Sequence, residues 1–322
     1  MSRHVLPGAP IEPHHWREVT IHMKPELSTD SAHNAARRGG ESGIRVSARS
    51  RAGRCALAPI FLLGAVNGAA AQLTPSAAQA FQGYVADVEA RLVRQHAQTK
   101  TYLATLDVGS GQRNQSEGDL MPGEVRTEPV NGGTRQLDAA LLHHWRGVAF
   151  IPGGTAKDMV ALLRGRLPGH SAPEIVSSRV LADDGGTATL AVRFQKQVVI
   201  AIVIDAEYKV EAKLTGDGRG YGISRGTHFW KVDDPGTKHE RRRPEGDDDG
   251  FLWRLNSYWS FVQAREGLEI ECEAVSLTRD VPRGLGWLIS PIVANLPREL
   301  LESTMTTTRN ALAEIAAAEG SR

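Results

Sequence analysis

The stretch FLWRLNSYWSFVQAREGLEIECEAVSLTR, residues 251–279, decides the fold of this chain. Alternation of apolar and polar residues with a period of two is typical of β-strands buried on one face. A turn at residues 265–266 pairs Trp259 with Cys272 and Phe261 with Ile270, whereas a slip of one residue would set the aromatic face against glutamates. The stretch therefore predicts an antiparallel hairpin of fixed register. One face of its first strand is expected to carry Trp253, Leu255, Ser257, Trp259 and Phe261.

The residues before this hairpin also favour strands. Asn131-Gly132-Gly133 is a strong turn signal and predicts the connection between strands at 124–130 and 140–152. Asp183 to Gly186 and Gly216 to Gly218 predict two further turns. Together these patterns predict an almost continuous antiparallel sheet. Its remaining strands are expected near 175–182, 187–204, 206–215 and 221–232.

Three segments have helical periodicity. Pro75 suits the first turn of a helix over 74–98, and Thr155 with Asp158 three residues later favours a short helix. The last helix is expected from Pro297 to Ala318, because one stripe of it is apolar. That stripe consists of Leu301, Met305, Thr308, Leu312 and Ile315. Burying its large apolar side chains contributes roughly 6–12 kcal/mol, so we expect this helix to lie against the sheet.

The N-terminal part has the features of a secretion signal. Arginines precede an apolar run from Cys55 to Val66, and Ala69-Ala70-Ala71 fits the rule for signal cleavage. The run is shorter than the roughly 20 residues of a membrane span. We therefore expect a periplasmic or secreted protein, cleaved near Ala71. The predicted organisation is a disordered leader (1–49) that a downstream start codon would leave untranslated, a signal peptide (50–71), a helix-and-loop extension (72–136) and a main domain (137–318).

Composition excludes several classes of function. Apolar residues make up 41% and charged residues 23% of the chain, which is ordinary for a soluble globular protein. The net charge is +1, and the residues after Ala71 carry a small acidic excess without a basic stripe. Nucleic-acid binding is not expected, because neutralisation of phosphates dominates that affinity. After cleavage only Cys272 remains, so no internal disulfide is expected.

The motifs with possible chemistry fail on their structural context. Gly222-Ile-Ser-Arg-Gly226 matches the nucleophile-elbow pattern, but a strand follows where that motif needs a helix. His143 and His144 are adjacent on a strand, so their side chains point to opposite faces and do not chelate one metal together. We therefore expect no catalytic residues, no metal and no cofactor.

Residues 250–312 resemble bacterial members of the START-like superfamily, which also holds polyketide cyclases and coenzyme Q-binding proteins. The resemblance extends over residues 137–318. The segments that carry the resemblance are 251–259, 271–282, Gly284-Leu-Gly-Trp-Leu-Ile-Ser-Pro291 and Leu296-Pro-Arg-Glu-Leu-Leu. It implies an α+β helix-grip fold, in which a curved antiparallel sheet wraps around the long C-terminal helix and leaves space for an apolar molecule. It implies no catalytic residue.

The resemblance also implies where a ligand would lie. The expected contacts are Trp253, Leu255, Trp259, Phe261, Cys272, Tyr208, Leu301 and Met305. If the sheet has the opposite orientation, Arg254, Asn256 and Tyr258 become the polar groups of the cavity instead, and His228 is a separate polar candidate, as a proton donor in the cavity.

Three functions fit these observations. The leading hypothesis is an exported, non-catalytic carrier of a lipid, quinone or polyketide-like molecule, with no protein partner and at most transient contact with a membrane. The second is a cyclase or dehydratase, which needs titratable groups inside the cavity. The third is a structural or partner-binding domain with a filled core.

Overall fold

The structure, a computed structural model, describes residues 72–104, 124–167, 174–197, 201–248, 251–280 and 286–321. All of them belong to one compact unit, Leu63–Arg322. The predicted leader (1–49) and signal peptide (50–71) lie outside the described residues. The elements in chain order are α1 (Pro75–His96), β1 (Val125–Leu137), β2 (Ala140–Pro152), α3 (Ala156–Leu163), β3 (Ile175–Asp183), β4 (Thr187–Gln197), β5 (Ala201–Gly216), β6 (Arg219–Asp233), β7 (Arg241–Arg242), β8 (Arg254–Ala264), β9 (Gly267–Arg279) and α4 (Gly286–Gly320).

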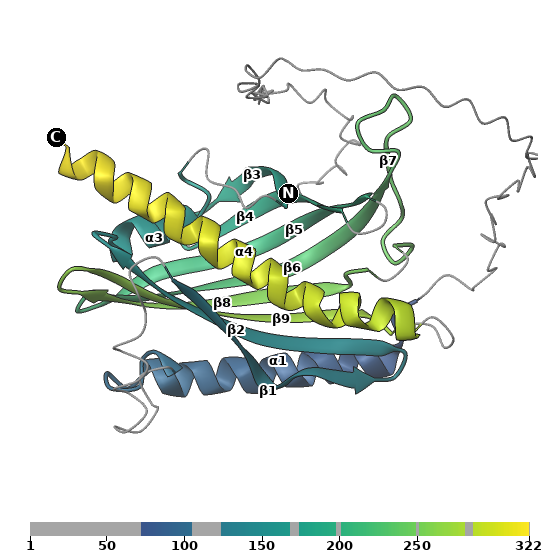
Figure 1. The fold of residues 1–322 in the computed structure, drawn as a ribbon, viewed down its shortest axis with the longest axis horizontal. Helices are drawn as coiled ribbons and strands as arrows, with labels where there is room; N and C mark the ends of the chain where they lie inside the picture. The colour runs from purple at the N-terminus through teal and green to yellow at the C-terminus, as the bar shows by residue number, and fades with distance from the viewer. Residues whose placement is uncertain are drawn as a thin grey trace, which may run out of the picture. The chain divides into compact units, whose positions relative to one another are not determined.

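The strands form one antiparallel sheet in the order β1-β2-β9-β8-β6-β5-β4-β3, and β7 pairs with β6. The predicted hairpin register is confirmed, because Trp259 pairs with Cys272 and Phe261 with Ile270. β2 pairs with β9, so an early and a late strand of the chain are neighbours in the sheet. Helix α4 crosses one face and α1 lies on the other (Figure 1). The architecture is α+β, a curved sheet with a long C-terminal helix, as predicted.

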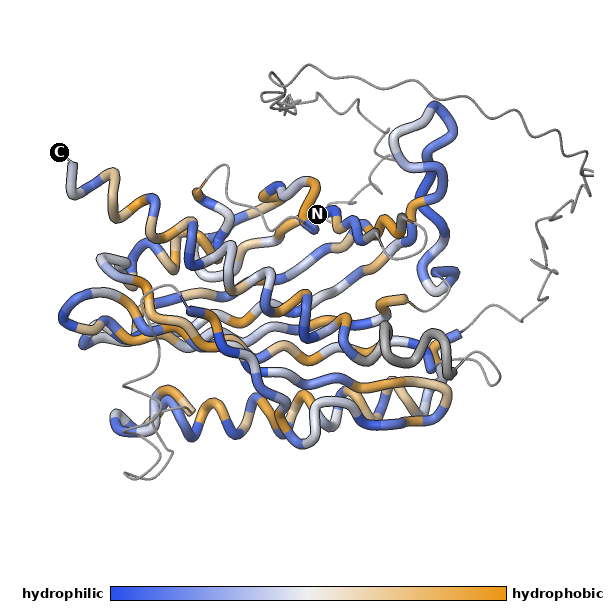
Figure 2. The backbone as a smooth tube through the Cα atoms, in the orientation of Figure 1, coloured by the Kyte–Doolittle hydropathy of each residue, from blue (hydrophilic) through white to orange (hydrophobic). Residues whose placement is uncertain are grey.

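Hydrophobic and hydrophilic residues alternate along several strands (Figure 2), and the core is divided between the two faces of the sheet. The inner face, on the side of α4, carries Trp259, Phe261 and Ile270 on β8 and β9, together with Leu301 and Met305 of the helix. The outer face packs against α1, whose buried residues recur at helical spacing. Those residues are Ala77, Phe81, Val88 and Leu92, and they contact Leu142, Val275 and Leu277.

Two predicted boundaries are wrong. Asn131-Gly132-Gly133 does not end β1 but forms an irregularity inside it, where all three residues have positive φ. The chain reverses later, between Leu137 and Ala140. The predicted break near residue 205 is also absent, because Asp205 stays within β5 and binds Arg193 and Arg242 there.

Helix α4 begins at Gly286, well before the predicted start at Pro297. A proline inside a helix removes one backbone hydrogen bond, so the rule that places proline in the first turn predicted a later start. The predicted first turns of the two other helices, α1 and α3, are confirmed. Thr74 caps α1 by accepting a hydrogen bond from the Ala77 amide, and Thr155 caps α3 by accepting one from Asp158.

Candidate functional site

The inner face beneath α4 is a filled core at its β2–β9–β8 end. Of the residues predicted to contact a ligand, Trp259, Phe261, Cys272, Leu301 and Met305 belong to one buried cluster here. The helix approaches the sheet closely over Gly147, where an added Cβ would lie 2.7 Å from Met305 Cγ. These five residues therefore pack against one another and position the helix.

The inner face continues over β4, β5 and β6 as a second apolar cluster, which we call the far cluster. Its buried members are Ala188, Leu190, Ala206, Tyr208, Val210 and Phe229, and its partly buried members are Val192, Phe194, Ile204, Leu252 and Leu255. Two predicted ligand contacts, Tyr208 and Leu255, therefore lie here. The Tyr208 ring makes edge-to-face contacts with Phe194 at 6.2 Å and with Phe229 at 5.9 Å between centroids.

The hydroxyl of Tyr208 is buried and has no hydrogen-bond partner in the structure. Its neighbours in the far cluster are apolar side chains. Burial raises the pKa of the phenol well above its usual value of 10.0, so the hydroxyl keeps its proton and remains a donor at neutral pH. An unsatisfied buried hydroxyl is unfavourable, and each such group calls for a specific explanation.

A polar clasp joins the edge of the sheet to α4 near the far cluster. Glu174 precedes β3, accepts a hydrogen bond from Ser303 of α4 at 2.5 Å and binds Lys196 of β4 at 3.2 Å. Lys196 also lies 3.8 Å from Glu299 of the same helix. Burial alone would raise the pKa of Glu174, but the hydrogen bonds from Ser303 and Lys196 outweigh it and lower the pKa. The clasp therefore connects α4 to the strands that carry the far cluster.

The predicted polar groups lie away from the inner face. Arg254, Asn256 and Tyr258 have the orientation of the outer face, where Tyr258 belongs to the cluster beneath α1. His228 is exposed and binds Glu245 at 3.1 Å. The alternative sheet orientation, which would have turned Arg254, Asn256 and Tyr258 toward a ligand, is therefore wrong.

Trp253 is also placed differently from the sequence prediction. It precedes β8, so the alternation that sets the faces does not reach it. Its ring joins the cluster beneath α1, and its indole nitrogen donates to Asp248 at 3.0 Å. Trp253 therefore supports the outer face and does not line the inner one.

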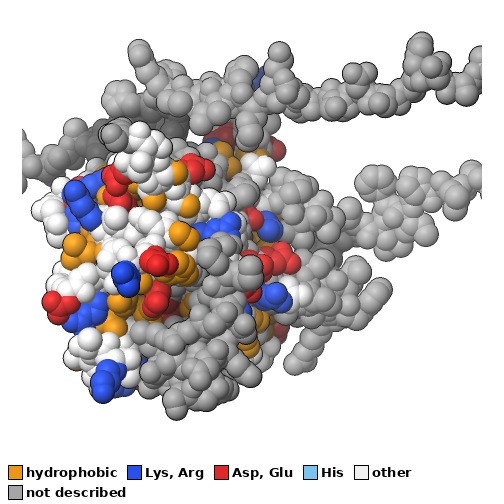
Figure 3. Space-filling model, turned by 60° about the vertical axis from the view of Figure 1, so that its left-hand side comes forward, with side chains coloured by type: hydrophobic (Ala, Val, Ile, Leu, Met, Phe, Trp, Pro, Cys, Tyr) orange, Lys and Arg blue, Asp and Glu red, His pale blue; other side chains and the backbone are white. Residues whose placement is uncertain are grey.

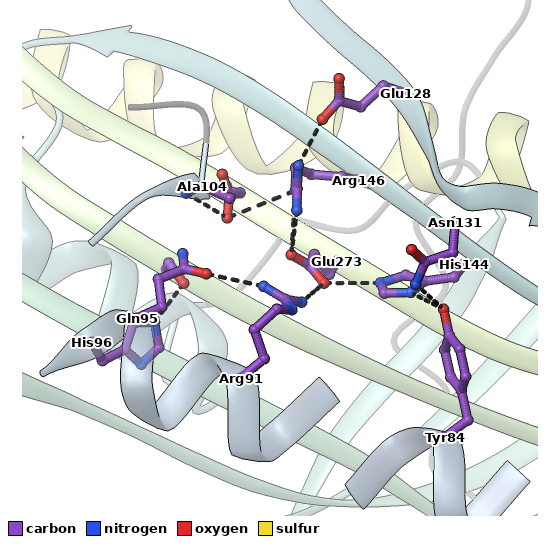
Figure 4. A network of polar contacts seen from close by, with 12 residues as sticks. Tyr84, Arg91, Gln95, His96, Ala104, Glu128, Asn131, His144, Arg146 and Glu273 are labelled. Atoms are coloured by element: carbon purple, nitrogen blue, oxygen red, sulfur yellow. Dashed lines mark hydrogen bonds and ion pairs between the residues drawn. The ribbon is translucent and has the colours of Figure 1, made fainter. Parts of the chain in front are cut away.

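The outer face contains a buried ionic network that the sequence analysis missed (Figure 4). Glu273, whose side chain is 1% exposed, binds Arg91 of α1, Arg146 of β2 at 3.0 Å and His144 at 2.8 Å. Tyr84 of α1 lies 2.8 Å from the other ring nitrogen of His144. Burial would raise the pKa of Glu273, but the hydrogen bond from His144 and the two arginine charges lower it to about 2. The alternating glutamates of β9 were visible in the sequence, but their partners on α1 were not.

A hollow of about 630 Å³ lies beside this network. Its lining comes from the end of α1, the residues after it and β2: Arg91, Arg94, Gln95, Gln98, Thr101, Ala104 and Arg146. The described residues contain no group of three or more His, Cys, Asp or Glu side chains placed to hold a metal ion. None of the described helices is both long and apolar enough to span a membrane. On the part of the surface that Figure 3 describes, acidic and basic side chains are interspersed.

His143 makes the stability of the domain depend on pH. It is fully buried on the face opposite His144, within 3.0–3.1 Å of Thr134 and Thr278. Burial lowers its pKa from 6.5 to about 4. As pH falls below about 6.5, the unfolded chain takes up the proton first, so stability declines until about pH 4, by up to about 3 kcal/mol.

We expect His143→Asn to remove the part of the decline that comes from His143, because asparagine keeps hydrogen-bonding groups but does not titrate; the part from His96, whose pKa burial also lowers to about 4, remains. Denaturant unfolding at pH 7 and at about pH 4.5 measures the difference. The matched control is His228→Asn at an exposed position. An equal loss of stability with pH in all three proteins would contradict the assignment to His143.

No family model matches the sequence, and no curated protein matches it. Solved structures of similar fold include a STAR-related lipid transfer protein from Xanthomonas axonopodis, with 16% identity, a TM-score of 0.36 and coverage of 56% of this chain and 98% of that one. An aromatase/cyclase from Streptomyces has 11% identity, a TM-score of 0.36 and coverage of 55% and 94%. A START superfamily protein from Mycobacterium smegmatis has 13% identity, a TM-score of 0.33 and coverage of 54% and 99%.

Proposed function

We propose that this chain, whose fold is START-like, binds a hydrophobic small molecule between α4 and the far cluster of the inner face. The observation that carries the proposal is the far cluster itself. Its side chains are apolar or aromatic, and five of them are only partly buried. Apolar walls with few polar groups are typical of sites for small molecules. The filled core at the β2–β9–β8 end then serves to hold α4 in place.

The clasp of Glu174, Lys196 and Ser303 supports this location. It links α4 to the strands of the far cluster through partly exposed polar groups. The contact of α4 with the filled core at the β2–β9–β8 end is apolar instead. Polar links between partly exposed groups are worth little individually, so they open more easily than a packed core. The clasp is therefore the side from which we expect a ligand to enter.

We also infer that the ligand is carried and not converted. General acid–base catalysis needs titratable groups beside the substrate. Tyr208 in the far cluster is a weak acid whose pKa is raised further, and the titratable groups of the nearby clasp, Glu174 and Lys196, are bound to each other. The ionic network around Glu273 lies on the opposite face. A carrier is favoured over a cyclase or dehydratase for this reason.

A bulky side chain introduced between α4 and the far cluster tests whether a ligand binds there. Val192 is partly buried and faces the far cluster, and its neighbour Ala191 points to the other face of β4. We expect native mass spectrometry to detect one molecule of methyl undecyl ketone bound to the wild-type chain and to Ala191→Trp, but none bound to Val192→Trp. Unchanged binding by a folded Val192→Trp would place the ligand elsewhere, and no binding by the wild type would contradict the proposal.

Export is the second part of the proposed function and rests on the apolar run and cleavage pattern of residues 50–71. We expect N-terminal sequencing of the periplasmic or secreted protein to start at Gln72. Recovery of a cell-internal protein that retains residues 50–71 would contradict export.

A further inference from the structure

The Tyr208 hydroxyl differs from the other buried polar atoms in its surroundings. A buried tyrosine hydroxyl usually finds a hydrogen-bond partner. Three described side chains have a buried polar atom without one: Trp145, Arg164 and Tyr208. Arg164 uses its other guanidinium nitrogens to bind Asp183 and the Gly186 carbonyl, and Trp145 lies over β1 at the opposite end of the sheet. Among these three, the Tyr208 hydroxyl is therefore the unpaired polar atom that lies in the far cluster.

The described chain offers no obvious substitute for the missing partner. The Tyr208 hydroxyl is among the buried polar atoms that have no hydrogen-bond partner among the described residues, and its ring lies among apolar side chains of the far cluster. The ring is held on two sides by Phe194 and Phe229, so the hydroxyl does not swing freely to another partner. A donor held rigidly in an apolar wall is suited to recognise an acceptor that arrives with a ligand.

We propose that the Tyr208 hydroxyl donates a hydrogen bond to the bound molecule, which is a neutral, mainly apolar compound with a hydrogen-bond acceptor such as a carbonyl oxygen. This inference rests on the proposed function and adds the class of ligand. Fatty acids fit less well, because a carboxylate buried without a counter-charge is strongly unfavourable. Lys196, the cation of the clasp, is already bound to Glu174 and Glu299.

The test compares methyl undecyl ketone with tridecane, which has the same chain length and no acceptor, and with laurate. For the wild-type chain we expect the ketone to bind about tenfold more tightly than tridecane, as one hydrogen bond provides, and more tightly than laurate. In Tyr208→Phe we expect the ketone to bind no more tightly than tridecane, because its carbonyl would be buried without a hydrogen-bond partner, and we expect tridecane to bind as it does to the wild type. The empty Tyr208→Phe protein should also melt about 2–4 °C higher, because an unsatisfied buried group is removed.

Tyr258→Phe is the matched control, because it removes the same atom on the outer face. The Tyr258 hydroxyl accepts from Asn256 at 3.1 Å and donates to Glu89 at 3.1 Å. We expect this variant to melt at a lower temperature and to keep the wild-type preference for the ketone. A higher melting temperature for Tyr208→Phe and a lower one for Tyr258→Phe would show that the first hydroxyl lacks a hydrogen-bond partner and the second has one.

The outcomes separate this inference from the function on which it rests. If the ketone and tridecane bind the wild type equally, or if Tyr208→Phe keeps the preference, the role of Tyr208 is wrong although an apolar site remains. If laurate binds most tightly, the neutral class of ligand is wrong. If none of the three binds the wild type, the proposed function fails as well.

Discussion

Glu273→Gln is expected to lower the free energy of unfolding by about 3 kcal/mol. Removing one partner of a buried ion pair typically costs about 3–5 kcal/mol, because the remaining charge stays in a poorly solvated place. Here the side chain of Arg146 is 16% exposed and that of Arg91 is 34% exposed, so water compensates part of the loss. The low end of the range is therefore expected. Urea denaturation near pH 7 measures it.

Glu128→Gln is the control for this prediction, since Glu128 binds the same arginine. The Glu128 side chain is 57% exposed and lies 2.8 Å from Arg146. Exposed ion pairs contribute about 0–1 kcal/mol, so we expect a small effect. Equal and small effects from both substitutions would show that the network does not attach α1 to the sheet.

The second large effect concerns the contact between α4 and β2. Met305 is fully buried, and Met305→Ala is expected to cost about 2–5 kcal/mol through loss of apolar contacts and a residual cavity. Gly147→Ala is expected to cost about 1–3 kcal/mol, because the new methyl group would lie 2.7 Å from Met305 Cγ and displace that side chain.

The two substitutions are expected to compensate each other, because Met305→Ala removes the atoms that the methyl group added by Gly147→Ala would meet. In the double variant the cost should be smaller than the sum of the single costs by at least about 0.5 kcal/mol. Unfolding experiments on the four proteins of the cycle measure this coupling. Strictly additive costs would mean that α4 does not lie over Gly147.

Local patterns were sufficient for the parts of the fold that depend on neighbouring residues. The 251–279 hairpin has one register that places Trp259 and Phe261 opposite apolar residues, and the structure has that register. The helix caps Thr74 and Thr155 also act within their own first turns. In each case interactions within one hairpin or one helical turn decide the structure.

Features that depend on distant segments were not predictable in the same way. The face on which α1 lies is set by Arg91 with Glu273 and by the packing of Phe81 and Leu92 on β2 and β9, which are remote in sequence. The alternation in the sequence assigns Trp253 to the same face as Trp259. Its side chain lies on the outer face instead, because β8 begins only at the next residue. The sequence predicted eight ligand contacts alike and did not separate Tyr208 and Leu255, which lie in the far cluster, from the residues that pack in the filled core.

The most direct test of the account is photoaffinity labelling with a long-chain ketone that carries a diazirine, followed by peptide mass spectrometry. If the ligand lies between α4 and the far cluster, cross-links should map to peptides of β4, β5 and α4, and Val192→Trp should abolish them. Cross-links that map instead to α1 and the outer face, and that survive Val192→Trp, would contradict a ligand site on the inner face.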